Sequence, residues 1–125
     1  MTVVDGSAGP VGVWSGVVRF DQQEEQFTIS FAADGSITLR TPISNGEGEW
    51  VWVGPKRFTY NLKETFSAEA PMAGWVDIAV DASVEGVTYS GVGTAKIHNE
   101  AGDVVHATSA TFSADRQAGV PVDLR

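Results

Sequence analysis

The sequence predicts an all-β fold: an eight-stranded antiparallel up-and-down barrel with no substantial helix. Gly and Pro interrupt the 125-residue chain at short intervals, and the segments between them are rich in β-branched and aromatic residues. The connections are short turn motifs such as "ADGS" and "SNGEG". Consecutive strands joined this way favour a meander, and closing it into a barrel removes the exposed sheet edges.

Eight segments are predicted as strands, within one domain whose ends at 1–10 and 117–125 are expected to be tails. In chain order the strands span residues 11–20, 26–32, 36–41, 49–53, 57–66, 74–82, 87–98 and 103–115. The fifth also allows a helix, because Phe58, Leu62 and Phe66 recur every four residues. That helix would leave Tyr60 off its apolar stripe and has no start cap, whereas threonines and aromatics favour a strand.

The turn motifs predict the register, because each pairing must keep apolar residues on one face. The predicted pairs are Phe31 with Ile37, Ile29 with Leu39, Trp50 with Tyr60, Trp52 with Phe58 and Val80 with Tyr89. The inward-facing set is then Trp14, Val18, Phe20, Phe27, Ile29, Phe31, Ile37, Leu39, Trp50, Trp52, Phe58, Tyr60, Leu62, Glu64, Val76, Ile78, Val80 and Tyr89.

The two ends of this barrel are predicted to differ. The longer connectors, at 21–25, 42–48 and 67–73, share one end, and the tight turns share the other. A loop-rich mouth above a tightly turned base is the shape of a binding cup.

Composition excludes several classes of function. The formal net charge of −8 disfavours nucleic acid and anionic membranes as partners. The absence of cysteine excludes disulfide and thiolate chemistry and is compatible with a reducing compartment. No signal peptide or apolar run of ~20 residues is evident, so we expect a soluble cytoplasmic protein. Phosphate, dinucleotide and metal motifs are also missing, so we expect neither cofactor nor metal.

Two features at the predicted base resemble a known family. "GVW" at residues 12–14 opens the first strand, and Arg116 closes the last. This pattern resembles lipocalins and calycins, in which a G-x-W tryptophan plugs the floor and an arginine packs across it, a favourable cation–π arrangement. In size and style the chain also resembles the small cofactor-free β-barrel cyclases of bacterial polyketide biosynthesis, including pericyclases of the Diels–Alderase type. The resemblance implies a lipocalin-like barrel with a hydrophobic ligand.

A set of mostly apolar side chains is predicted to contact that ligand: Phe31, Leu39, Trp50, Trp52, Phe58, Leu62, Phe66, Met72 and His106. Plain core packing is the alternative for the aromatic members. The facing of His106 depends on the last turn, since a three-residue loop turns it outward and a four-residue "NEAG" loop turns it inward. Inward-facing Phe112 and Arg116 favour the inward alternative.

Glu64 stands out because it lies on the apolar face of "FTYNLKETF". A carboxyl in an apolar cup has a raised pKa and can hydrogen-bond or move a proton, so we predict a catalytic role for Glu64. Tyr60 and Tyr89 are predicted to assist as phenol donors. The alternative is that the strand twists outward at its end, which would leave Glu64 solvated.

These observations favour a protein that binds a hydrophobic small molecule in the barrel lumen. The resemblance to the barrel cyclases implies cofactor-free ring closure, a cycloaddition or a related reaction, of a polyketide-type intermediate, for which a shaped apolar cup suffices. The alternatives are a non-catalytic carrier or sensor with the same cup, and a structural barrel with a filled core. Val51 and Val53 make the outer face of their strand apolar, which predicts a homodimer, with a covering tail as the alternative.

Overall fold

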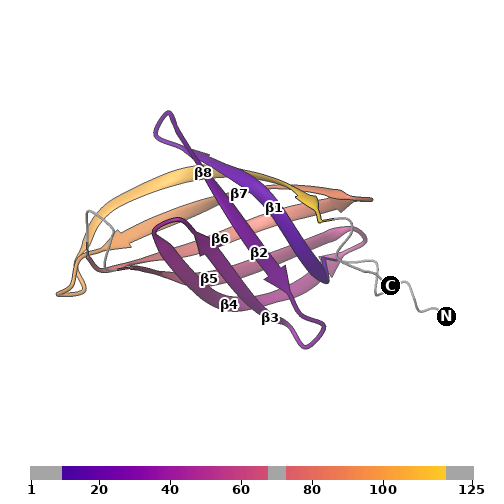
Figure 1. Cartoon of the computed structure of the whole chain (residues 1–125), viewed down its shortest axis with the longest axis horizontal. Coiled ribbons are helices and arrows are strands. Elements are labelled where there is room, and N and C mark those ends of the chain that lie inside the picture. The colour runs from indigo at the N-terminus through magenta and orange to yellow at the C-terminus, as the bar shows by residue number, and fades with distance from the viewer. Residues whose placement is uncertain (1–9, 68–72, 118–125) are drawn as a thin grey trace.

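The eight strands close into a single antiparallel barrel in the computed structural model, which describes residues 10–67 and 73–117 (Figure 1). Sequence neighbours pair throughout, and the last strand returns to pair with the first. The strands are β1 (Gly12–Phe20), β2 (Gln23–Phe31), β3 (Ser36–Thr41), β4 (Ser44–Gly54), β5 (Arg57–Phe66), β6 (Trp75–Glu85), β7 (Thr88–His98) and β8 (Val104–Arg116). The predicted fold class is confirmed, and no helix in the described part could cross a membrane.

Most of the predicted register is confirmed. The predicted pairings across β2–β3 and β4–β5 all occur, so the alternation of apolar residues set these registers correctly. The pairing of Val80 with Tyr89 is wrong. β6 continues to Glu85 before turning at Gly86, which has a φ of 60°, so Tyr89 pairs with Val84 instead.

Two of the connectors predicted to be long are short turns. β1 and β2 are joined by Asp21 and Gln22 alone, whose φ angles of 49° and 63° suit the twist of a two-residue hairpin. β4 begins at Ser44, inside the glycine-rich segment that resembled a loop. Gly48 is required there by crowding, because a Cβ atom at this position would lie 2.7 Å from the Cβ of Leu62.

The base of the barrel is plugged by Trp14, as predicted. Its Nε1 donates a hydrogen bond to the carbonyl oxygen of Pro10 at 2.8 Å, so Pro10, predicted to lie in a tail, is buried against the floor. The guanidinium carbon of Arg116 lies 4.4 Å from the centroid of the indole. Gly12, with a φ of 132°, leaves room for this guanidinium, since a Cβ would lie 2.7 Å from Nη1. This floor is consistent with a lipocalin-like barrel.

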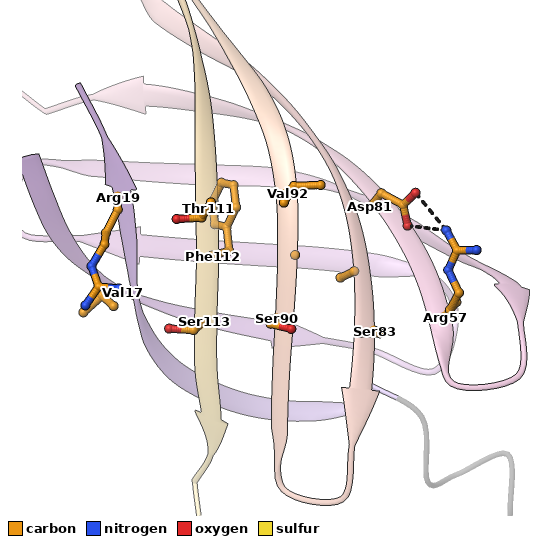
Figure 2. A pocket seen from close by; sticks show the side chains of 12 residues that line it. Val17, Arg19, Arg57, Asp81, Ser83, Ser90, Val92, Thr111, Phe112 and Ser113 are labelled. Atoms are coloured by element: carbon orange, nitrogen blue, oxygen red, sulfur yellow. Dashed lines mark hydrogen bonds and ion pairs between the residues drawn. The ribbon is translucent and has the colours of Figure 1, made fainter. Parts of the chain in front are cut away.

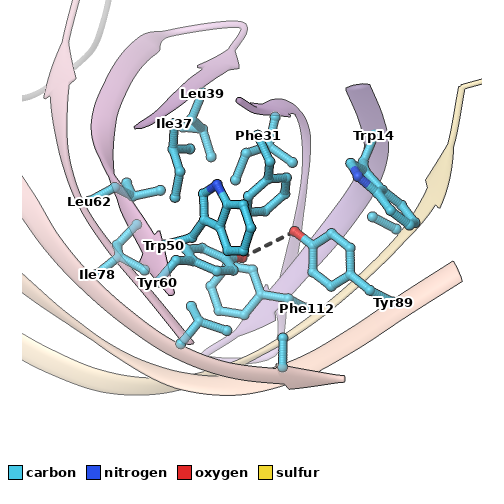
Figure 3. Packing of buried hydrophobic residues seen from close by; sticks show 14 of the residues in the cluster. Trp14, Phe31, Ile37, Leu39, Trp50, Tyr60, Leu62, Ile78, Tyr89 and Phe112 are labelled. Carbon is cyan, nitrogen blue, oxygen red and sulfur yellow. Dashed lines mark hydrogen bonds between the residues drawn. The ribbon is translucent and has the colours of Figure 1, made fainter. Parts of the chain in front are cut away.

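Above the floor, aromatic side chains fill the lower half of the lumen (Figure 3). Phe31 lies at the centre and makes edge-to-face contacts with Trp50, Phe58, Tyr60 and Tyr89, at centroid distances of 5.4–6.4 Å. This half of the barrel is therefore a close-packed core, and any space for a ligand has to lie nearer the mouth.

Candidate functional site

A cavity of about 380 Å³ occupies the mouth half of the lumen. β7 and β8 present the small side chains of Ala95 and Ala110 to this cavity. Its apolar lining consists of Val18, Phe20, Phe27, Leu39, Ile43, Phe66, Val76, Ile78, Ala95, Ile97, Ala110 and Phe112. Its polar lining consists of Asp21, Gln23, Glu25, Thr41, Glu64, His106 and Thr108.

Glu64 faces this cavity, as the period-two pattern of β5 predicted, and only 8% of the residue is exposed. Ser44, at the start of β4, donates a hydrogen bond to Glu64 Oε2. Burial raises the pKa of the Glu64 carboxyl, and the negative charge of Glu25 raises it further, while the hydrogen bond from Ser44 lowers it. Because Glu64 lies in the barrel interior, the alternative of a solvated strand end is excluded.

A short chain of hydroxyl groups orients the Glu64 carboxyl. The backbone N–H of Ile43 donates to Thr41 Oγ1, which lies 2.5 Å from Ser44 Oγ. Since Ser44 uses its single hydroxyl hydrogen on Glu64, Thr41 must be the donor to Ser44. Oε2 is thereby occupied, whereas Oε1 has no hydrogen-bond partner among residues 10–67 and 73–117. Oε1 is the atom left for a ligand.

Glu25 is a second carboxyl in the cavity, and the sequence analysis missed it. It lies on β2, half-buried, two residues before the inward-facing Phe27. Burial raises its pKa as well. Counting back by two from Phe27 reaches Glu25, but the predicted strand begins at residue 26 and leaves Glu25 in a connector.

At the rim of the cavity, Asp21 connects the tip of the β1–β2 hairpin to β8. Its Oδ2 lies 2.8 Å from His106 Nε2, and its Oδ1 accepts a hydrogen bond from Thr108 at 2.8 Å. These hydrogen bonds hold the pKa of Asp21 below its ordinary value. His106 lies on the cavity side, but the predicted four-residue loop is not the reason. The turn pairs His98 with Val104, and the irregular pairing between Ile97 and His98 then brings His106 opposite Ile97. The imidazole remains half-exposed at the rim.

The structure brings part of the predicted ligand-binding set to the cavity. Four predicted residues line it: Leu39, Glu64, Phe66 and His106. Six others lie in the core outside its lining: Phe31, Trp50, Phe58, Tyr60, Leu62 and Tyr89. Met72 lies outside the described residues.

Trp52 is a correction to the inward-facing set, because 41% of it is exposed. The pairing of β4 with β5 is irregular between Trp52 and Gly54, at the very base of the barrel. The indole therefore covers the edges of Trp50 and Phe58, at centroid distances of 5.8 and 6.2 Å, without entering the lumen.

The side chains of Tyr60 and Tyr89 are hydrogen-bonded to each other within the core. Their hydroxyl oxygens lie 3.1 Å apart, the contact drawn in Figure 3. Burial raises the pKa of both phenols, so both remain neutral under ordinary conditions. Since neither lines the cavity, the structure does not bring these two predicted donors to a ligand bound there.

A second hollow, of about 550 Å³, lies on the outer face of β6, β7, β8 and β1 (Figure 2). It is lined mainly by small side chains such as Ser83, Ser90 and Ser113. Its one drawn ion pair, Arg57 with Asp81 at 2.9 and 3.0 Å, already uses both charges. This hollow is therefore a weaker candidate than the lumen. No group of three or more metal-ligating side chains occurs in the described part of the chain.

The fold and the site together define a class: a closed, eight-stranded antiparallel barrel with a tryptophan–arginine floor, a filled base and a cavity at its mouth. Comparison with known proteins adds no narrower assignment, since no family model, no curated protein and no solved structure matches the chain.

Proposed function

We propose that this barrel binds one small, predominantly apolar molecule in its mouth cavity. The observation that supports this most is the cavity itself, about 380 Å³ of space lined chiefly by aliphatic and phenylalanine side chains above a packed core. Pockets for small molecules typically begin at about 300 Å³ and have such linings, with a few polar groups among them.

The cost of the cavity to the fold supports the same proposal. Unfilled space in a protein interior forfeits packing energy, and the base of the same barrel shows that this sequence can fill its lumen. Glu25 and Glu64 add a further cost, because ionisable groups resist removal from water. A ligand would offset both costs, whereas packing alone would select neither.

A catalytic role is the second part of the proposal, and Glu64 is the observation that favours it. Cofactor-free ring closure of a flexible polyketide-type intermediate needs a shaped apolar cup, which folds the chain so that its reacting ends meet. Glu64 Oε1, which has no hydrogen-bond partner within the described residues, would carry a proton or stabilise charge that develops during the reaction. A carrier or sensor would use the same cup without turnover.

Binding to the cavity is tested with a substitution whose larger side chain occupies the cavity. Wild-type protein should bind a small neutral solvatochromic dye such as Prodan saturably, with one site per chain. Ala95→Phe places a ring in the cavity and should weaken binding by at least about tenfold, since the pocket volume is lost. Ala107→Phe makes the same change on the exposed outer face of β8 and should leave the affinity unchanged. Equal dye affinity in both variants would place the dye outside the lumen.

Turnover is tested separately. Purified protein is incubated with a linear polyene that closes slowly by itself, and product is followed by chromatography with mass detection. A catalyst should exceed the spontaneous rate, and Glu64→Gln should lose most of that excess while still binding the dye. Dye binding without any rate excess for a range of polyenes would favour the carrier.

A further inference from the structure

The charges in the mouth cavity are unbalanced. Three carboxyl groups line it, those of Asp21, Glu25 and Glu64, and Asp21 is already held by His106 and Thr108 at the rim. Glu25 and Glu64 form no ion pair with any residue in 10–67 or 73–117. Two of the three carboxyls that line the cavity therefore have no cationic partner within the described residues.

The basic residues of the chain lie elsewhere. Seven of the eight lysines and arginines are in the described part, and none of them lines the cavity. Arg19, Arg40, Lys56, Arg57, Lys63 and Lys96 are exposed on the outside of the barrel, and Arg116 packs on Trp14 at the floor. Basic residues of the described chain form ion pairs on the outer surface, as between Arg19 and Glu24 at 2.6 Å.

The burial and hydrogen bonding of Glu64 suit contact with a ligand in the cavity. Glu64 is more than nine-tenths buried, its Oε2 accepts a hydrogen bond from Ser44, and its Oε1 has no partner in the described part of the chain. Buried carboxylates in proteins are normally paired with a cation or a metal. Since the described chain supplies neither, the missing charge is expected to arrive with the bound molecule.

We propose that the ligand consists of an apolar body with one positively charged nitrogen, and that Glu25 and Glu64 bind this cation. The proposal rests on the proposed function and narrows the class of ligand. Glu25 enters from β2 and Glu64 from β5, so an ammonium group between them would contact a carboxyl from each. The body of the ligand would lie against Leu39, Ile78 and Phe112. Carboxylate ligands, fatty acids among them, would meet like charges and be rejected.

The test uses four probes that share an eight-carbon chain and differ in the polar group: octylamine, 1-octanol, 2-octanone and octanoate. Their affinities are measured by calorimetry near neutral pH with the full chain. Octylamine should bind more tightly than 1-octanol by on the order of tenfold or more, because a charge pair away from bulk water is strong. Octanoate should bind most weakly.

Three matched variants assign the effect to the cavity. Glu25→Gln and Glu64→Gln should each reduce the octylamine-to-octanol affinity ratio several-fold while leaving octanol binding nearly unchanged. Glu24→Gln removes the same charge from the opposite, exposed face of β2 and should leave the ratio as in wild type. An equal fall in all three variants would indicate only long-range attraction and would overturn the proposal.

The remaining outcomes separate the two proposals. Similar affinities for all four probes would refute the cationic ligand but leave the apolar cup in place. A preference for 2-octanone or octanoate would also refute it, since the carboxyls would then be acting as protonated donors. Failure of all four probes to bind would contradict the proposed function itself and this inference with it.

Discussion

Trp14 is the single residue on which the floor of the barrel depends. Its ring meets Tyr89 edge-to-face at 5.1 Å and lies under the Arg116 guanidinium, and its N–H is satisfied by Pro10. Trp14→Ala should therefore lower the free energy of unfolding by about 3–5 kcal/mol, the usual range for a large aromatic core truncation. Denaturant unfolding measures this directly.

Trp52→Ala is the matched control, because Trp52 is partly exposed and lies outside the lumen. It should cost clearly less than Trp14→Ala. A loss under about 1 kcal/mol for Trp14→Ala would show that the floor is not a packed plug.

Glu64 should make stability depend on pH with a definite sign. Its folded-state pKa is raised above the ordinary glutamate value of about 4.3, so between these two values the folded chain binds more protons than the unfolded chain. Stability contributed by this group is therefore greatest at acidic pH and falls as pH rises through that window. Glu64→Gln should remove this loss of stability with rising pH. The variant should therefore be more stable than wild type by an amount that grows with pH, and the difference should vanish at pH values below the two pKa values.

Denaturant melts of wild type and Glu64→Gln across that pH range test this expectation. Glutamine keeps an oxygen to accept the hydrogen bond from Ser44, so the comparison isolates the charge. Glu47→Gln, on the exposed outer face of β4, should show no such pH-dependent gain. A Glu64→Gln advantage independent of pH would mean that the carboxyl is not destabilised in the fold.

The direction of Glu64 could be predicted from the sequence, and its surroundings could not. Alternation through β5 fixed which way the side chain points. Its partners Thr41 and Ser44 lie at a hairpin of β3 and β4 whose glycine-rich sequence is typical of a loop. Gly48 serves instead to relieve crowding inside the barrel, and this is visible only once the opposite strand is in place.

At the scale of the elements, the β1–β2 hairpin is held in an unusual way. Both of its turn residues have positive φ, and Gln22 is not one of the residues, Gly, Asn and Asp, that ordinarily adopt that region. Gln22→Gly should therefore stabilise the protein by about 0.5–1 kcal/mol, a gain that thermal or denaturant unfolding can resolve.

Asp21→Gly also places glycine at a turn position with positive φ, but it removes the hydrogen bonds to His106 and Thr108. It should gain less than Gln22→Gly or lose stability. If both variants gained equally, the attachment of the hairpin to β8 would contribute nothing.

The same hairpin shows why strand boundaries were only partly predictable. "FDQQEEQF" contains no Gly, Pro or Asn, and its one turn residue, Asp21, is followed by Gln22 where a two-residue turn usually has Gly. The connection between β4 and β5 carries "GPK", and there the prediction of both the turn and the pairs across it is confirmed. Turn residues thus indicated the register across β4 and β5, whereas Gly86 did not prevent the wrong pairing of Tyr89. The missed turn between β1 and β2 concealed Glu25.

At the scale of the whole molecule, the lower half of the barrel stabilises the fold and the upper half leaves space. Aromatic rings fill the base, while the mouth contains a cavity whose lining includes Ala95 of β7 and Ala110 of β8. The interpretation of a wholly filled structural barrel therefore fits only the base. Most of the inward-facing set was predicted correctly, yet the sequence did not show at which level the packing would end, because that depends on how rings from opposite strands meet.

The outer surface near the base bears the apolar patch formed by Val51, Trp52 and Val53, which are 58%, 41% and 51% exposed. We propose that this patch is the contact of a homodimer, as apolar outer faces commonly are. Val51→Lys should then yield monomer in analytical ultracentrifugation. Val92→Lys, at an equally exposed valine on the outer face of β7, should remain dimeric. A monomeric wild type at micromolar concentration would refute the dimer.

The central claim, that the mouth of the lumen is a binding site, is tested most directly by mapping a titration onto the backbone. Amide chemical shifts of the isotope-labelled chain are followed as 1-octanol is added. We predict saturable shifts at Leu39, Glu64 and Ala110, with little change at Tyr89 in the core. Shifts concentrated at Ser90 and its neighbours on the outer face, or no saturable shifts at all, would contradict it.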